Sequence, residues 1–167
     1  MDSFIEKIIV KKKTFQDRLI SAGVVLGGFV LFFGLQLVEF LAQFFLVIAA
    51  AIVYFLYQFI TSRNVEFEYI VTNGDLDIDK ITAQRKRKRI FSGNCKDFDI
   101  LAKLKGGLND RRIQNVKNKI FAVSSIDSED VYFATLIYKG EQTVVFFEPD
   151  ERMLNSFKVF IPRKIES

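Results

Sequence analysis

Two long uncharged segments, separated by a single glutamate, most constrain what this chain can fold into. Residues 19–38 form 20 positions without a charge and residues 40–62 form 23, with Glu39 between them. A helix rises about 1.5 Å per residue, so each segment can cross the roughly 30 Å hydrocarbon core of a bilayer. We therefore predict two membrane-spanning helices, at about 19–37 and 40–60, joined by a tight turn.

Two other interpretations of the apolar segments are disfavoured. A pair of helices buried in a soluble domain would need much more surrounding polypeptide than a chain of 167 residues supplies. A secretory signal is an alternative for the first segment only. The segment is long for a signal, lacks a small-residue cleavage site after it, and is followed at once by a second apolar segment.

Basic residues flank the two segments on one side only. Lys7, residues 11–13 and Arg18 precede the first segment, Arg63 follows the second, and the turn between them has none. Lysine and arginine are enriched in cytoplasmic loops. We therefore expect a multi-pass protein of the cell membrane, with a helical hairpin over residues 19–61 and both termini in the cytoplasm.

Small residues interrupt the first apolar segment at Gly23, Gly27, Gly28 and Gly34. Such residues let helix backbones approach closely in lipid. One interpretation is that this face packs the first helix on the second within one chain. The other is homodimerisation through Gly23 and Gly27. The short turn already holds the two helices together, which favours the first interpretation.

The N-terminal residues 1–18 are predicted to be an amphipathic cytoplasmic arm. Phe4, Ile5, Ile8 and Ile9 share one face if residues 2–13 are helical, which is the pattern of a helix lying on the inner leaflet. The alternative is that these residues simply flank the first apolar segment, and that their lysines fix its orientation in the membrane. The two interpretations are compatible.

Residues 62–167 have the pattern of an antiparallel β domain. Apolar and polar side chains alternate on both sides of Asn73-Gly74, the strongest two-residue hairpin signal, because both positions tolerate positive φ. The register set by this turn places Glu68 opposite Asp79. An Asp150-capped amphipathic helix ends the domain near Pro162.

Further strands are predicted between the first hairpin and this C-terminal helix. The ranges are a third strand at 85–91, a short strand at 120–124, and a second hairpin at 131–138 and 142–147; residues 95–104 fit either strand or helix, and 105–119 fit a loop. A curved antiparallel sheet or small barrel, capped by the C-terminal helix, would bury both apolar patterns. The predicted fold is thus an α+β membrane protein: a transmembrane hairpin followed by a pleckstrin-homology-like (PH-like) domain.

Several short motifs resemble one known family. They are Thr-Ser-Arg-Asn at 61–64, Glu-Phe-Glu-Tyr at 66–69, the run from Thr72 to Ile81, Cys-Lys-Asp-Phe at 95–98, and Ile-Pro-Arg-Lys at 161–164. In this order after two apolar segments, they are similar to a family of uncharacterised small two-span bacterial membrane proteins. The resemblance covers nearly the whole chain and implies a bacterial cell membrane. It implies no activity and no functional residues.

The composition disfavours the common catalytic machineries. The chain has no histidine and one cysteine, so it has no Ser–His–Asp triad, no Cys–His dyad and no His-ligated zinc site. We expect no catalytic residue, no cofactor and no metal site. An oxygen-rich cation site from Glu66, Glu68, Asp77 and Asp79 is disfavoured against a simple acidic face, since the spacing of a calcium-binding loop is missing.

The best candidate for a functional surface is the basic run Arg85, Lys86, Arg87, Lys88 and Arg89. One interpretation is cross-strand ion pairing with the three aspartates of the preceding strand. A second is contact with anionic lipid headgroups of the inner leaflet, and a third is a protein partner. Nucleic acid is disfavoured as a partner because the net charge is only +4 and no RNA-binding aromatic motif is present.

Two functions follow as hypotheses from these observations. The first is a non-catalytic, membrane-anchored module that binds a protein or anionic lipid headgroups at the inner surface of the lipid bilayer. The second is a small accessory subunit of a larger membrane complex, whose hairpin docks on a membrane protein partner or on a second copy of itself.

Overall fold

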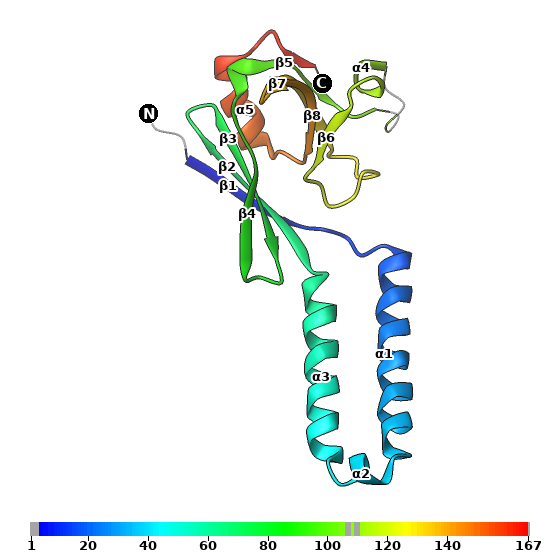
Figure 1. The fold of residues 1–167 in the computed structure, drawn as a ribbon. Coiled ribbons are helices and arrows are strands. Elements are labelled where there is room, and N and C mark those ends of the chain that lie inside the picture. The colour runs from blue at the N-terminus through cyan, green and yellow to red at the C-terminus, as the bar shows by residue number, and fades with distance from the viewer. Residues whose placement is uncertain (1–3, 106–107, 109–110, 167) are drawn as a thin grey trace. The chain divides into compact units, whose positions relative to one another are not determined.

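The structure, a computed structural model, describes residues 4–105, 108 and 111–166. The chain divides into two compact units (Figure 1). Residues 12–64 form one, called the helical unit below. Residues 1–11 and 65–167 together form the other, called the β unit. The predicted arm, residues 1–18, is therefore divided: residues 1–11 belong to the β unit and residues 12–18 to the helical unit.

The helical unit contains α1 (Phe15–Gln36), α2 (Glu39–Ala42) and α3 (Phe45–Ser62). Thr14 caps α1 through a capping box with Asp17, in which each side chain accepts a hydrogen bond from the backbone N–H of the other residue. The second long helix begins at Phe45 rather than at Phe40 as predicted, because residues 39–42 make a separate helical turn within the connection. No residue of α1 or α3 is buried.

The N-terminal strand β1 (Phe4–Val10) replaces the predicted amphipathic helix, and that prediction is wrong. The strand pairs antiparallel with β2 along its whole length, from Phe4 opposite Thr72 to Val10 opposite Glu66. Its Ile and Val residues suit a pleated, half-buried strand, and alternate side chains face the core. The partner strand lies beyond the helical unit in the sequence, so local periodicity could not reveal it.

The first sheet has the order β1-β2-β3-β4, with every neighbouring pair antiparallel. Its other strands are β2 (Val65–Thr72), β3 (Asp75–Thr82) and β4 (Lys86–Asn94). Asn73 and Gly74 connect β2 to β3 with φ of 51° and 91°, as the predicted turn requires. Glu68 stands opposite Asp79, so the predicted register is confirmed.

The second sheet has the order β6-β8-β7-β5-β9. Its strands are β5 (Phe98–Lys103), β6 (Asn118–Phe121), β7 (Tyr132–Tyr138), β8 (Glu141–Phe147) and β9 (Ile165–Glu166). The β7–β8 hairpin is antiparallel, as predicted. The two edge strands β6 and β9 are parallel to their neighbours, so this sheet is mixed rather than purely antiparallel as predicted.

The described part of the β unit also contains the helices η1 (Cys95–Asp97), α4 (Arg111–Gln114) and α5 (Glu151–Phe160). Asp150 caps α5 by accepting a hydrogen bond from the Met153 N–H at 2.8 Å, which confirms the predicted start of this helix. The C-terminal helix lies beside the two sheets in Figure 1.

The main core of the β unit joins both sheets and α5. Tyr69, Ile78 and Phe91 of the first sheet share one buried cluster with Phe147 of the second sheet and Phe157 of α5. A smaller apolar cluster, which includes Phe133 and Phe146, lies on the second sheet. The predicted α+β class, with two apolar helices, antiparallel sheets and a C-terminal helix, is confirmed. The two sheets do not close into a barrel.

A candidate binding surface on the β3–β4 hairpin

The basic run lies at one end of the first sheet, in the turn between β3 and β4 and along β4. Ala83 and Gln84 both have φ of 55°, and the Arg85 N–H donates to the Thr82 carbonyl at 3.1 Å. The turn thus has the positive φ values of a hairpin connection, although neither residue is the glycine or asparagine usually found there. All five residues of the run, 85–89, are exposed.

A register shift in the β3–β4 pair decides which basic residues meet the acidic ones. Ile78 lies opposite Phe91, and the next residue of β3, Asp79, lies opposite Arg89, so Ile90 is the extra residue of a bulge. Side chains alternate between the faces of a strand. Arg87 and Arg89 therefore share the outer face of the sheet with the acidic side chains.

These two arginines form ion pairs with the acidic residues of β2 and β3. Arg87 Nη2 lies 2.8 Å from Glu68 Oε1, and Arg89 Nη1 lies 2.5 Å from Asp77 Oδ2. Arg89 also donates to Asp79 through Nε. The ion-pairing interpretation therefore applies to Arg87 and Arg89. The guanidinium groups stand where a bound cation would have to sit, which argues against the oxygen-rich cation site.

Two of the carboxylates on this face, those of Glu68 and Asp79, are buried beneath the arginines, whereas Asp77 is partly exposed. Glu68 and Asp79 are each 3% exposed. Burial raises the pKa of Glu68, and its neighbour Arg87 opposes that shift. The hydrogen bond to Asp79 raises the pKa of Arg89 further above its ordinary value.

The other basic residues of the run lie on the opposite face or in the turn. Lys88 is paired in register with Lys80 of β3, and Lys86 with Thr82, which places all three lysines on one face. Arg85 stands in the turn. Among the described residues, none of these four cations makes an ion pair or a side-chain hydrogen bond. Lys80 was not a predicted site residue, because its place beside Lys86 and Lys88 depends on the register of the β3–β4 pair, which the sequence analysis did not determine.

The glycines of α1 have different surroundings. A Cβ atom on Gly28 would lie 3.0 Å from Leu56 Cδ1, so this glycine permits the close contact between α1 and α3. A Cβ atom on Gly23, Gly27 or Gly34 would meet nothing within 4 Å. Packing within one chain therefore accounts for Gly28 and leaves the other three glycines facing open space.

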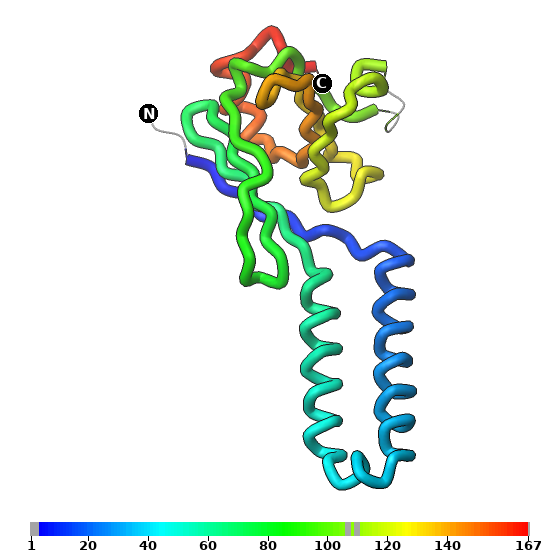
Figure 2. Tube along the Cα trace, viewed as in Figure 1, coloured from blue at the N-terminus to red at the C-terminus, as the bar shows by residue number. Residues whose placement is uncertain are grey.

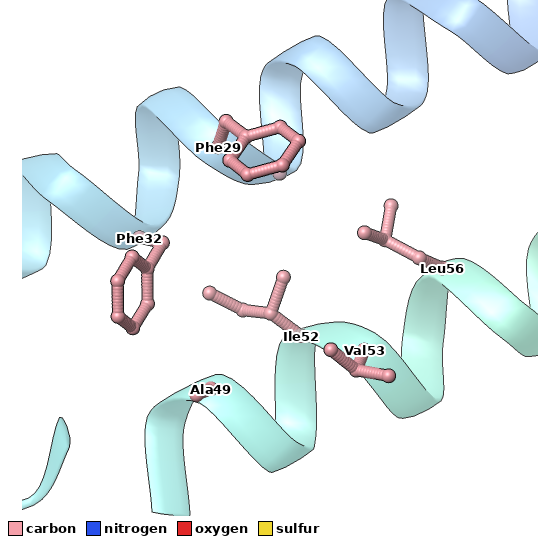
Figure 3. A pocket seen from close by; sticks show the side chains of 7 residues that line it. Phe29, Phe32, Ala49, Ile52, Val53 and Leu56 are labelled. Carbon is pink, nitrogen blue, oxygen red and sulfur yellow. The ribbon is translucent and has the colours of Figure 1, made fainter. Parts of the chain in front are cut away.

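An apolar cavity of about 210 Å³ lies between the two long helices, beside Gly28. Figure 3 shows the side chains that line it. They are Phe29 and Phe32 from α1 and Ala49, Ile52, Val53 and Leu56 from α3. All of them are hydrocarbon, so the cavity offers no group that would orient a polar ligand.

A family model described as Bacterial PH-like domain (DUF6106) matches residues 1–167. The chain belongs to this family. The predicted resemblance to a bacterial family of unknown function, with a PH-like domain, is confirmed. Comparison with curated proteins and with solved structures gave no match. A PH-like domain is in general a binding module, and the family description assigns no activity or ligand.

Proposed function

We propose that this protein is a membrane-anchored binding module, whose PH-like domain is held at the cytoplasmic face of the bacterial cell membrane. One observation carries the proposal: the helical unit is inserted between two paired strands of the same sheet. Figure 2 shows the chain leaving β1 in blue, passing through the helices and returning into β2 in green.

The pairing of β1 with β2 fixes where the helical unit begins and ends. Val10 lies opposite Glu66, and the Lys11 N–H donates to the Val65 carbonyl at 2.9 Å. Adjacent strands are about 4.8 Å apart. The chain therefore leaves and re-enters the β unit at neighbouring points. If α1 crosses a membrane, α3 must cross back, which is the topology of a hairpin with the whole β unit on one side.

The surface of the two long helices supports placement in lipid. Phe29 is 58% exposed, Val30 is 74% exposed and Phe55 is 69% exposed. A core helix of a soluble protein would bury such side chains, because apolar surface in water is costly by about 25 cal/mol per Å². Both helices are also long and apolar enough to cross a bilayer by length and composition.

The distribution of charge supports a cytoplasmic β unit. Residues 11–13, Arg18 and Arg63 lie at the ends of the helices that join the β unit. The connection between the long helices contains Glu39 and no basic residue. Basic flanks on the cytoplasmic side are the general rule for membrane proteins.

Labelling of cysteines in intact bacterial cells tests this proposal. The native Cys95 is fully buried, so it should not react with the maleimide and can stay in the protein. Glu39→Cys, in the connection, is expected to react with a membrane-impermeant maleimide in intact cells. Asn155→Cys, on the exposed side of α5, is expected to react only after the membrane is permeabilised. Labelling of Asn155→Cys in intact cells, or recovery of the protein in the soluble fraction, would overturn the proposal.

The open space beside Gly23, Gly27 and Gly34 favours a second candidate function, an accessory subunit of a larger membrane complex. Small residues on a helix face permit close approach of another helix in lipid. An effect of enlarging Gly27 on the assembly state of the protein would support this candidate, and the matched experiment is given in the Discussion.

A further inference from the structure

We infer that Lys80, Lys86 and Lys88, with Arg85 beside them, bind the phosphate groups of anionic phospholipids in the bilayer that anchors the chain. These four residues are called the lysine face below. The inference rests on the proposed function, because it needs the β unit to lie next to a membrane. It goes further by naming the ligand and by separating these cations from the neighbouring arginines.

The three lysines are neighbours on one face of the β3–β4 hairpin. Lys80 and Lys88 are direct cross-strand partners, and Lys86 follows Lys88 by two positions on the same strand. Directly opposed side chains have Cβ atoms about 5 Å apart. All three side chains are exposed. The hairpin thus presents a compact group of positive charges instead of a dispersed basic strand.

This arrangement is unfavourable for the isolated fold. Like charges directly opposite one another on a sheet are destabilising. On the outer face of the same hairpin, every arginine faces a carboxylate. On the lysine face, no carboxylate in the described part of the chain pairs with Lys80, Lys86 or Lys88. An anion from outside the chain would supply the missing partner.

Chain connectivity limits how far the lysine face can lie from the end of α3. Val65 follows Ser62 by three residues, and Val65 is in register with Thr82, which is in register with Lys86. Three residues span at most about 10 Å, and two strand spacings add about 10 Å. Lys86 therefore lies within about 20 Å of the residue at which the apolar helix ends.

The chemistry of the lysine face suits a layer of lipid headgroups. Lysine is a compact point charge on a flexible stem and needs no fixed geometry in its anion, whereas arginine selects planar, bidentate partners. Lipid phosphates are mobile and present at high local density. Anionic leaflets attract clusters of basic residues at short range, and salt weakens that attraction.

Acetylation footprinting of the full-length protein in lipid nanodiscs tests the inference. Two compositions are compared: phosphatidylcholine alone, and phosphatidylcholine with an equal part of phosphatidylglycerol. The reactivity of Lys80, Lys86 and Lys88 is expected to fall about fivefold in the anionic discs, the effect of one favourable charge contact per lysine. Lys117 and Lys158, which are exposed elsewhere on the β unit, serve as internal references and are expected to change much less. High salt should reverse the protection, and added inorganic phosphate should not reproduce it in neutral discs.

A pair of matched variants tests the same inference through stability. The wild-type β unit is expected to unfold at higher temperature in anionic than in neutral discs, because binding to the folded state stabilises it. Lys80→Gln/Lys86→Gln/Lys88→Gln should lose this difference. The control Lys117→Gln/Lys139→Gln/Lys158→Gln removes the same charge from other exposed positions and should keep it.

The variant Lys80→Glu separates binding from folding. It places a carboxylate opposite Lys88, so the β unit should become more stable in neutral discs while the gain from anionic lipid falls. A purely structural role for Lys80 predicts loss of stability in both lipids.

Three results would overturn the inference: equal footprints in both lipids, equal protection of all lysines, or protection by poly-glutamate in neutral discs without protection by phosphatidylglycerol. The last result would make the lysine face a protein-binding site. Failure of the proposed function would give a different result, because a protein that is not membrane-anchored would not enter the discs at all.

Discussion

Arg87 reaches across strand β3 to Glu68, with its Nη2 atom 2.8 Å from Oε1 of the carboxylate. The arginine is about half exposed, whereas the carboxylate is 3% exposed. This contact separates two groups of charges that are adjacent in the sequence. Arg87 and Arg89 neutralise buried carboxylates on one face of the sheet, and the lysines between and beside them remain available on the other face.

The first prediction concerns the stability provided by Arg87. Arg87→Gln should lower the free energy of unfolding by about 1–2 kcal/mol, because it removes a charge-assisted hydrogen bond from a buried carboxylate. Arg85→Gln is the control, since Arg85 lies in the exposed turn, and its effect should stay within about 0.5 kcal/mol. Denaturant titration of both variants in the same detergent measures the difference. Equal effects of the two variants would show that the ion pair between Arg87 and Glu68 contributes nothing to stability.

The second prediction concerns pH and Glu68. Burial raises the pKa of Glu68 above its ordinary value of 4.5, so the folded state holds this proton more tightly than the unfolded chain. The contribution of Glu68 to stability is therefore most favourable below pH 4.5 and is lost as pH rises through the folded pKa. Relative to Glu68→Gln, the wild type should gain stability as pH falls from 7 towards about 5. Denaturant titrations of both proteins across this range give the difference, and a difference that does not vary with pH would contradict the prediction.

The third prediction separates the glycines of α1. Gly28→Leu should disrupt the hairpin, because even a Cβ atom there would lie 3.0 Å from Leu56. Gly27→Leu is the matched control, since a Cβ atom at Gly27 meets nothing within 4 Å of its own chain. Disulfide cross-linking of cysteines placed on α1 and α3 measures hairpin packing, and sedimentation in detergent measures assembly. A change of assembly state with Gly27→Leu alone would show that this position contacts another helix.

The fourth prediction concerns the role of β1. Because Lys11 and Val65 are hydrogen-bonded neighbours, an Asn-Gly turn should be able to replace residues 12–64 and leave the β unit folded. This shortened protein is expected to be soluble and to unfold cooperatively. Residues 65–167 alone lack β1, whose Ile9 is in the core and whose Ile5 packs against it, so they should be less stable or aggregate. Circular dichroism and two-dimensional NMR distinguish the outcomes. Equal folding of both fragments would show that β1 is dispensable.

The fifth prediction concerns the link between the two sheets. The hydroxyl of Tyr69 donates to the Ala122 carbonyl and accepts a hydrogen bond from the Glu148 N–H at 3.2 Å. Tyr69→Phe leaves both backbone groups without this partner, which should cost about 1–3 kcal/mol. Tyr138→Phe removes a hydroxyl that makes no hydrogen bond among the described residues, and should cost much less. Thermal unfolding of the two variants supplies the comparison.

Local patterns in the sequence were sufficient for several elements of the structure. The uncharged segments predicted the two long helices, Asn73-Gly74 predicted the first hairpin and its register, and Asp150 predicted the start of α5. Each of these signals lies within a few residues of the structure that it produces. Turn chemistry, capping and periodicity act at that range, so they can be recognised without knowledge of the fold.

Other features depended on contacts between distant parts of the chain. Residues 4–10 contain apolar side chains that suit a helix or a strand, and pairing with the edge of β2, which follows the helical unit in the sequence, makes them a strand. The sequence identified the basic run but did not show which of its residues lie on which face of the sheet. The bulge at Ile90 decides which of them face Glu68 and Asp79. Lys80 lies on the lysine face because it pairs with Lys88 across the two strands. Cross-strand register, a property of tertiary pairing, determines which side chains share a surface.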